Sequence, residues 1–139
     1  MARGYLTEDV KVTAAAPTVT GTTTIDTAEV DMAGWDGVLF VVRFGTPASN
    51  NNIRGQQDVV TGMAGAADLA GTLVNHATNA VHMLDLQRPQ ERFIRCRVTR
   101  GTSTTIDTML VLQYRGRNKP PTQPTSVLEQ FTGPAEGTA

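Results

Sequence analysis

The side chains that could act as nucleophiles or metal ligands are few and scattered in this chain. Cys96 is the only cysteine, and it lies in an alternating apolar segment, where a lone thiol is typically a small buried hydrophobe. His76 and His82 have no pattern of carboxylates around them, whereas a metal site needs several converging ligands. The sequence therefore predicts no metal site and no cofactor.

The carboxylates do not form a catalytic pattern either. They are spread over turns and strand edges, where aspartate is favoured for local hydrogen bonding, at Asp26, Asp31, Asp36, Asp58, Asp68, Asp85 and Asp107. A catalytic pair among them is an alternative that the sequence leaves open. No phosphate-binding glycine loop, zinc-protease helix motif or nucleophile elbow occurs in the chain. We therefore predict that the protein is not an enzyme and has no catalytic residues.

Basic residues are concentrated in one segment, residues 88–119, which holds eight of the twelve Lys and Arg residues. Only Glu91 and Asp107 oppose them, so this segment carries +6 although the whole chain sums to −1. This segregation along the sequence predicts two oppositely charged surfaces. Arginine is favoured at interfaces because its planar guanidinium makes bidentate contacts. The partner-binding residues that we predict here are Arg88, Arg92, Arg95, Arg97, Arg115, Arg117 and Lys119.

The basic segment allows three interpretations. Binding of single-stranded nucleic acid would need stacking aromatic residues between the basic ones, and only Phe93 and Tyr114 are so placed, so nucleic acid is disfavoured. Binding of an acidic protein surface is the second interpretation, because guanidinium groups pair with carboxylates. The third is a solvated sheet face with intramolecular ion pairs that each contribute little. Arg95 and Arg97 fit either of the last two.

The elements that would position these side chains are short strands. Residues 38–44 are apolar on both faces until Arg43, which suits the centre of a sheet covered on both sides. In residues 93–100, Ile94, Cys96 and Val98 alternate with outward-facing arginines. A turn at residues 101–103 and a return strand at 106–114 then predict that the basic segment is a β-hairpin. Further predicted features are strands at 25–32, 53–60 and 81–86, a turn at 34–37 and a short helix around 66–70.

The sequence predicts one domain with an extended arm at each end. We predict an N-terminal arm at residues 1–24, a domain at 25–119 and a proline-rich arm at 120–139. The fold class is all-β, a β-sandwich or jelly-roll with at most one short helix. The apolar residues of the arms that we expect to contact a partner are Tyr5, Leu6, Val127, Leu128 and Phe131.

The composition limits the class of protein further. A single cysteine excludes an intramolecular disulfide. The first residues lack the apolar core of a signal peptide, and no apolar run approaches the ~20 residues that cross a bilayer. We therefore expect a soluble protein that is made in a cytoplasm and has no membrane partner.

Several segments are similar to recurring elements of small proteins from the structural gene clusters of tailed phages. The similarity covers roughly residues 25–121, and the chain resembles the capsid cement, or decoration, proteins that staple major capsid proteins together. None of the segments is catalytic. They are AGWDGVLFVV at 33–42, AADLAGT at 66–72, DLQRPQERFIRC at 85–96 and LQYRGRNKP at 112–120.

This resemblance implies a β-sandwich or jelly-roll subunit that binds the outside of an assembled phage head and stabilises the shell against internal DNA pressure. Its partners would be the phage major capsid protein and other copies of itself, with a dimer favoured over a trimer. It would be made in the bacterial host cytoplasm and would lie on the outer capsid surface of the virion. The alternatives are a head-completion or head–tail joining protein and a nucleic-acid-binding protein that uses the basic hairpin.

Overall fold

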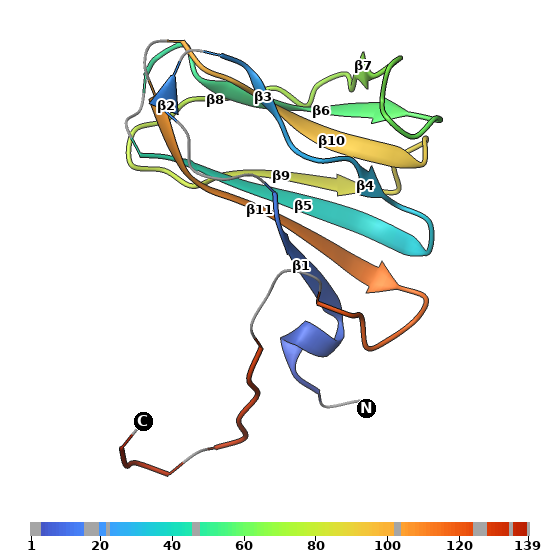
Figure 1. The fold of residues 1–139 in the computed structure, drawn as a ribbon, viewed down its shortest axis with the longest axis vertical. Coiled ribbons are helices and arrows are strands. Elements are labelled where there is room, and N and C mark those ends of the chain that lie inside the picture. Colours follow the sequence, from blue (N-terminus) through green and yellow to red (C-terminus); the bar gives the residue numbers. More distant parts are fainter. Residues whose placement is uncertain are drawn as a thin grey trace.

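The computed structural model describes residues 4–15, 20–21, 23–45, 48–101, 104–123, 128–133 and 135–138. The described chain is a sandwich of two antiparallel β-sheets (Figure 1), which confirms the predicted fold class. The first sheet has the strand order β1-β11-β5-β9, with β2 paired to β11. The second has the order β3-β10-β6-β7, with β4 paired to β10 and β8 paired to β6.

The strands differ widely in length. Those of the first sheet are β1 (Val10–Ala14), β2 (Thr20–Gly21), β5 (Trp35–Phe44), β9 (His82–Gln87) and β11 (Thr104–Gly116). Those of the second are β3 (Ile25–Asp26), β4 (Val30–Asp31), β6 (Asn52–Asp58), β7 (Ala67–Asp68), β8 (Val74–Asn75) and β10 (Phe93–Thr99). The one helix in the described residues is the 3-10 turn η1 (Leu6–Glu8).

The core lies between the two sheets because alternate side chains of each strand point inward. Full burial of an aliphatic or aromatic side chain stabilises a fold by roughly 1.5–3 kcal/mol, so the central strands dominate the stability. The apolar side chains that are at most 1 % exposed are Val38, Phe40 and Val42 on β5, Ile53 on β6, Ile94, Cys96 and Val98 on β10, and Ile106 on β11.

The predicted hairpin of β10 and β11 is wrong. Strand β10 pairs with β3, β4 and β6, whereas β11 pairs with β1, β2 and β5, so the chain crosses from one sheet to the other between them. Because of this crossing, the buried side chains of β10 and those of β11 enter the core from opposite sheets. A hydrogen bond from the Gly101 N–H to Asn51 Oδ1 (2.9 Å) holds the chain where it leaves the second sheet. Alternation alone does not distinguish a hairpin from such a crossing, because both bury one face of each strand.

The predicted helix around residues 66–70 is also wrong. Residues Ala67–Asp68 form β7, which pairs with Gln57 and Gln56 of β6. The Asp68 carboxylate accepts hydrogen bonds from Arg54 Nε (3.1 Å) and Gln56 Nε2 (2.7 Å). These contacts with β6 outweigh the helix propensity of a short alanine-rich segment that glycines limit at both ends.

Two other boundaries differ from the predictions. The predicted turn at residues 34–37 lies earlier, with Gly34 at φ +84°, and Trp35 already belongs to β5. The predicted strand at 25–32 is interrupted: β3 and β4 both pair with β10, and between them the Thr27 N–H donates to the Cys96 carbonyl (2.9 Å). Both changes bring the loop before β5 to the end of the sandwich where β9 also ends.

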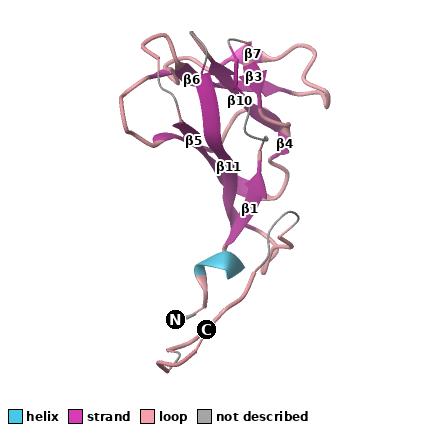
Figure 2. Cartoon of the chain, turned by 60° about the vertical axis from the view of Figure 1, so that its left-hand side comes forward, coloured by secondary structure: helices cyan, strands magenta, loops and turns pink. Residues whose placement is uncertain are grey.

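The segments predicted as arms pack partly against the sandwich and partly against each other. Strand β1 lies within the predicted N-terminal arm and pairs along its whole length with β11 at the edge of the first sheet. Beyond β1, η1 and the described part of the C-terminal segment extend away from the sandwich on the same side (Figures 1 and 2).

We expect the Cys96 thiol to be unreactive in the folded protein. Burial raises the pKa of this thiol to about 12, so very little thiolate is present at about pH 8. A chromogenic disulfide reagent should release no colour from the native chain and should detect the single cysteine after unfolding in guanidinium. Rapid reaction of the native chain would contradict the placement of Cys96 between the sheets.

Candidate functional site

Four of the predicted partner-binding basic residues are held in ion pairs within the chain. Arg97 lies directly across from Asp26 in the β10–β3 pair and binds its carboxylate with Nε (2.8 Å) and Nη2 (2.9 Å). Arg95 reaches the same carboxylate at 3.6 Å and donates from Nε to Gln56 Oε1 (2.8 Å). The hydrogen bond from Arg97 lowers the pKa of Asp26, although burial acts in the opposite direction.

The second bidentate pair joins Arg92, just before β10, to Asp31 of β4. The Arg92 Nε and Nη2 atoms each lie 2.8 Å from a different Asp31 oxygen, and the Ala33 N–H donates to Oδ1 (2.9 Å). The hydrogen bond from Arg92, followed by that from Ala33, lowers the pKa of Asp31 to about 2. Lys119 pairs with Asp9 at 2.9 Å. The structure thus supports the interpretation of a solvated face with intramolecular pairs for these residues.

Three other predicted residues, Arg88, Arg115 and Arg117, are exposed and form no ion pair with the described residues; we call them the available arginines. Arg88 follows β9, and its N–H donates to the Asp36 carbonyl (2.7 Å). The N–H of Arg117, after β11, donates to the Gly34 carbonyl (2.8 Å). The Arg115 guanidinium lies over the Tyr114 ring, 5.9 Å from its centre.

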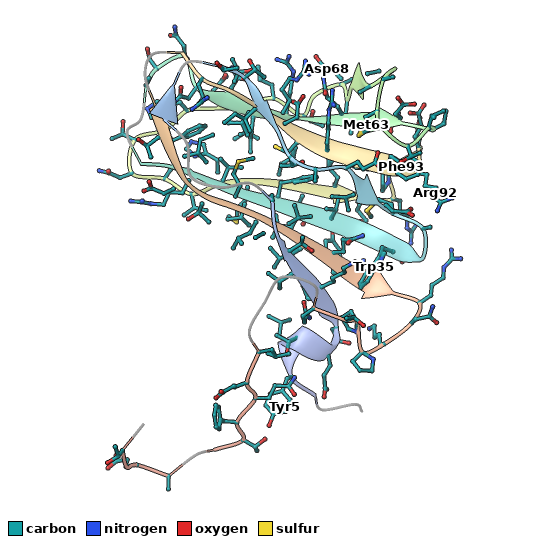
Figure 3. The ribbon with its side chains drawn as sticks, in the orientation of Figure 1. Tyr5, Trp35, Met63, Asp68, Arg92 and Phe93 are labelled. Carbon is teal, nitrogen blue, oxygen red and sulfur yellow. The ribbon has the colours of Figure 1, made fainter. Side chains whose placement is uncertain are left out.

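The available arginines gather at one end of the sandwich. Arg88 and Arg117 line an open cleft of about 510 Å³, together with Arg92 and Trp35. Figure 3 shows Arg92 and Trp35 at the same end, where the loop before β5 meets the loop between β9 and β10. Asp36 and Glu91 also line this cleft, so its charge is mixed and it is not a dedicated anion site. The remaining arginine of the basic segment, Arg100, is buried, and its Nε donates to the Thr23 carbonyl (2.6 Å).

Four of the predicted arm residues, Tyr5, Leu6, Leu128 and Phe131, lie in a second structure, which we call the stalk: residues 4–9 and the described residues of 119–133. The side-chain amide of Gln123 connects its two halves to the edge of β1. Its Nε2 donates to the carbonyls of Thr7 (3.0 Å) and Val10 (2.8 Å), and its Oε1 accepts from the Val12 N–H (2.8 Å). Gln123 therefore occupies two of the backbone groups at the edge of β1, the Val10 carbonyl and the Val12 N–H, that a further strand would use.

The stalk exposes large apolar side chains. Leu6 is 72 % exposed, Phe131 is 65 % exposed and Leu128 is 42 % exposed, whereas Tyr5 is half-buried and its hydroxyl hydrogen-bonds with Thr132. Figure 3 shows Tyr5 in the stalk, away from the sandwich. Gln130 Nε2 donates to Thr7 Oγ1 (2.9 Å) and adds a further tie between the two halves. Val127 lies outside the described residues.

Sequence reasoning missed a third surface, the outer face of the first sheet. It carries apolar side chains of β1, β11, β5 and β9 that point away from the second sheet, among them Leu39, Val41, Leu110 and Leu112. The signal was present, since residues 38–44 are apolar on both faces and so predict cover on both sides of their sheet.

The residues first considered for covalent or metal chemistry lie apart from these surfaces. His82 is buried, its Nε2 accepts from the Ala77 N–H (3.0 Å), and burial lowers its pKa. His76 stacks on it with ring centres 6.1 Å apart. In the part of the chain that the structure describes, no three His, Cys, Asp or Glu side chains gather where they could hold a metal ion. The described residues also include no helix that is long and apolar enough to span a membrane.

Comparison with models of known protein families finds no match, and comparison with curated proteins finds no significant match.

We expect the Asp31 carboxyl group to be still ionised at about pH 3. The hydrogen bond from Arg92 lowers the folded-state pKa of this group from the usual 3.8 to about 2. A depressed pKa means that the pair stabilises the fold above about pH 4 and that this contribution is lost as the pH falls toward 2. Carboxyl-carbon NMR titration measures the midpoint directly.

Arg92→Ala should return the Asp31 midpoint toward 3.8, whereas Arg88→Ala, which changes a nearby arginine without a carboxylate partner among the described residues, should leave it low. A wild-type midpoint near 3.8 would show that the pair does not form in solution.

Proposed function

We propose that the protein is a structural virion component that binds the outer surface of an assembled phage head and staples neighbouring major capsid proteins. The observation that carries this proposal is the stalk, which holds Leu6, Leu128 and Phe131 in solvent on an element that projects from the sandwich. Exposed apolar groups of this size mark contact surfaces when they gather on one part of a protein.

The stalk has the properties of an anchor. An exposed aromatic ring that enters a pocket of a partner contributes a large share of an interface's binding energy. The hydrogen bonds of Gln123 and Gln130 between the two halves fix the stalk before binding, so that less conformational entropy is lost when the partner binds. The stalk would thus insert between capsid subunits while the sandwich remains on the surface.

The available arginines provide the second contact. Arg115 and Arg117 lie where β11 leads into the stalk, so a capsid surface that binds the stalk would also meet these guanidinium groups. Acidic capsid loops are suitable partners, because complementary charges steer association and fix orientation. A cement protein repeats such contacts over a symmetric shell, where many weak contacts add up and share the pressure of packaged DNA.

Nucleic acid fits these surfaces less well. Arg92, Arg95 and Arg97 already lie beside carboxylates, which would have to be displaced before phosphates could bind. A head-completion or head–tail joining protein would use the same kind of stalk contact and differs in copy number. The copy number of a cement protein scales with the number of capsid subunits, whereas a joining protein forms one ring.

Replacing the apolar residues of the stalk should weaken head binding. We expect Leu128→Ser with Phe131→Ser to bind at least roughly tenfold more weakly, because aromatic anchors commonly contribute about 2 kcal/mol or more. Heads assembled without this protein are mixed with the purified chain and banded on a density gradient, and bound chain is quantified against major capsid protein.

The matched control is Val59→Ser with Val60→Ser, two apolar residues of similar exposure on the turn after β6. A truncation that ends at Gln123 is a better test of the tail than one that ends at Lys119, because it retains the amide that caps β1. Equal binding of both double variants would contradict the anchoring role. Saturation at a single ring of copies would favour the joining protein, and binding to DNA with a steep salt dependence would favour the nucleic-acid alternative.

A further inference from the structure

The free edge of β9 lacks the cover that the chain places on two other strand edges. At the opposite edge of the first sheet, Gln123 binds two backbone groups of β1. In the second sheet, the Leu69 N–H donates to the Gly55 carbonyl of β6 (2.9 Å), and Thr72 Oγ1 accepts from the Gly55 N–H (3.1 Å). Among the described strands, β9 pairs only with β5. An uncovered edge of this kind is a template for a further strand.

The backbone groups of β9 that point away from β5 belong to Met83, Asp85 and Gln87. In an antiparallel pair, the N–H and C=O groups of alternate residues point to the same side of the strand. The Arg88 N–H donates to the Asp36 carbonyl across this pair (2.7 Å), so the N–H groups two and four residues earlier also point toward β5. The three residues between them therefore present their N–H and C=O groups to the open edge.

A groove beside this edge can receive side chains of an added strand. It has a volume of about 460 Å³ and lies between the last residues of β9 and the loop after β7. Leu86 of β9, Gln57 of β6, and Leu69 and Thr72 of the loop contribute to its walls. A strand added to β9 would place alternate side chains in this groove and over the outer face of the first sheet. Such pockets for alternate side chains provide the specificity of strand addition.

The outer side chains of β9 define the chemistry of the partner. Val81, just before the strand, and Met83 are 51 % and 58 % exposed. Asp85 accepts a hydrogen bond from the Tyr114 hydroxyl and forms no ion pair with the described residues. Side chains directly opposite each other in antiparallel strands are in contact. An added strand therefore fits best with a basic residue opposite Asp85 and an apolar residue opposite Met83.

We propose that β9 binds an extended segment of a partner protein as an additional antiparallel strand, with a basic residue of that segment opposite Asp85. A second copy of this chain is a poor occupant, because a symmetric pair of β9 strands centred on Asp85 would place two carboxylates directly opposite each other. The identity of the partner rests on the proposed function, under which the segment belongs to the major capsid protein.

Strand addition at β9 would explain how one subunit staples two capsid proteins. Strands β1 and β9 are the two opposite edges of the first sheet, and the stalk leaves the sandwich beside β1. A capsid subunit that binds the stalk and a neighbour that supplies the added strand would thus be held at opposite edges of one sheet. Hydrogen bonds to the main chain provide the affinity of such an added strand.

Amide hydrogen exchange of the full chain, free and bound to phage heads, tests the proposal. In the free chain, the amides of Met83, Asp85 and Gln87 should exchange rapidly, whereas those of Leu84 and Leu86 should be protected by their bonds to β5. Binding to heads should slow the exchange of the first three at least about tenfold. The exchange is quenched in acid and resolved by residue with fragmentation mass spectrometry.

Variants of Gln87 separate the backbone donor from its side chain. Gln87→Pro removes one free N–H and leaves the bonds to β5 in place, so we expect about fivefold weaker binding to heads. Gln87→Ala keeps the N–H and should bind like the wild type. Asp85→Lys should also bind more weakly, because the basic residue of the partner would face a like charge. The resistance of Cys96 to a thiol reagent reports that each variant is folded.

The outcomes distinguish this proposal from the proposed function. Heads that bind the wild type without protecting Met83, Asp85 and Gln87 would overturn the strand addition and leave head binding intact. Equal binding of Gln87→Pro and Gln87→Ala would overturn it as well. Protection of these amides in the free chain at high concentration would show that a second copy occupies the edge, against the proposal. A chain that does not bind heads would contradict the proposed function itself and, with it, the capsid protein as the occupant.

Discussion

The side chains of strand β5 are apolar on both faces of the first sheet, and this pattern decides how the two sheets can pack. A strand places alternate residues on opposite sides of its sheet, so burying Val38, Phe40 and Val42 necessarily directs Leu39 and Val41 outward. The second sheet covers the inner row. Leu110 and Leu112 of β11 and Val12 and Ala14 of β1 extend the outer row across the sheet. The inner row is thus buried between the sheets, whereas the outer row lies outside that core.

The sequence predicts the class of fold and the inward faces of its best strands. The alternation of Ile94, Cys96 and Val98 is the same in the structure, because the period of two is a property of any half-buried strand. Strand pairing was not predictable, since β10 and β11 would alternate in the same way in a hairpin. The inward-facing residues of β9 were also difficult to predict from the sequence. The first of them is the buried His82, whereas the more apolar Met83 faces outward.

The charge pattern shows a similar limit for the candidate site. The basic segment and the acidic first part of the chain are separate in sequence, and this predicted two oppositely charged surfaces. In space they interleave, because β3 and β4 bring Asp26 and Asp31 alongside β10. Three of the predicted basic residues, Arg92, Arg95 and Arg97, are therefore paired with carboxylates. Arg88, Arg115 and Arg117 form no ion pair with the described residues, and that distinction depends on strand pairing, which the spacing of charges does not encode.

The stalk is the part of the molecule on which the proposed binding to a phage head depends, because it exposes Leu6, Leu128 and Phe131. An electron cryomicroscopy map of heads incubated with the chain tests the proposed head binding. We expect small β-sandwiches repeated over the outside of the shell, each with its stalk directed between capsid subunits. A map without added density outside the shell, or with density confined to one vertex, would contradict it.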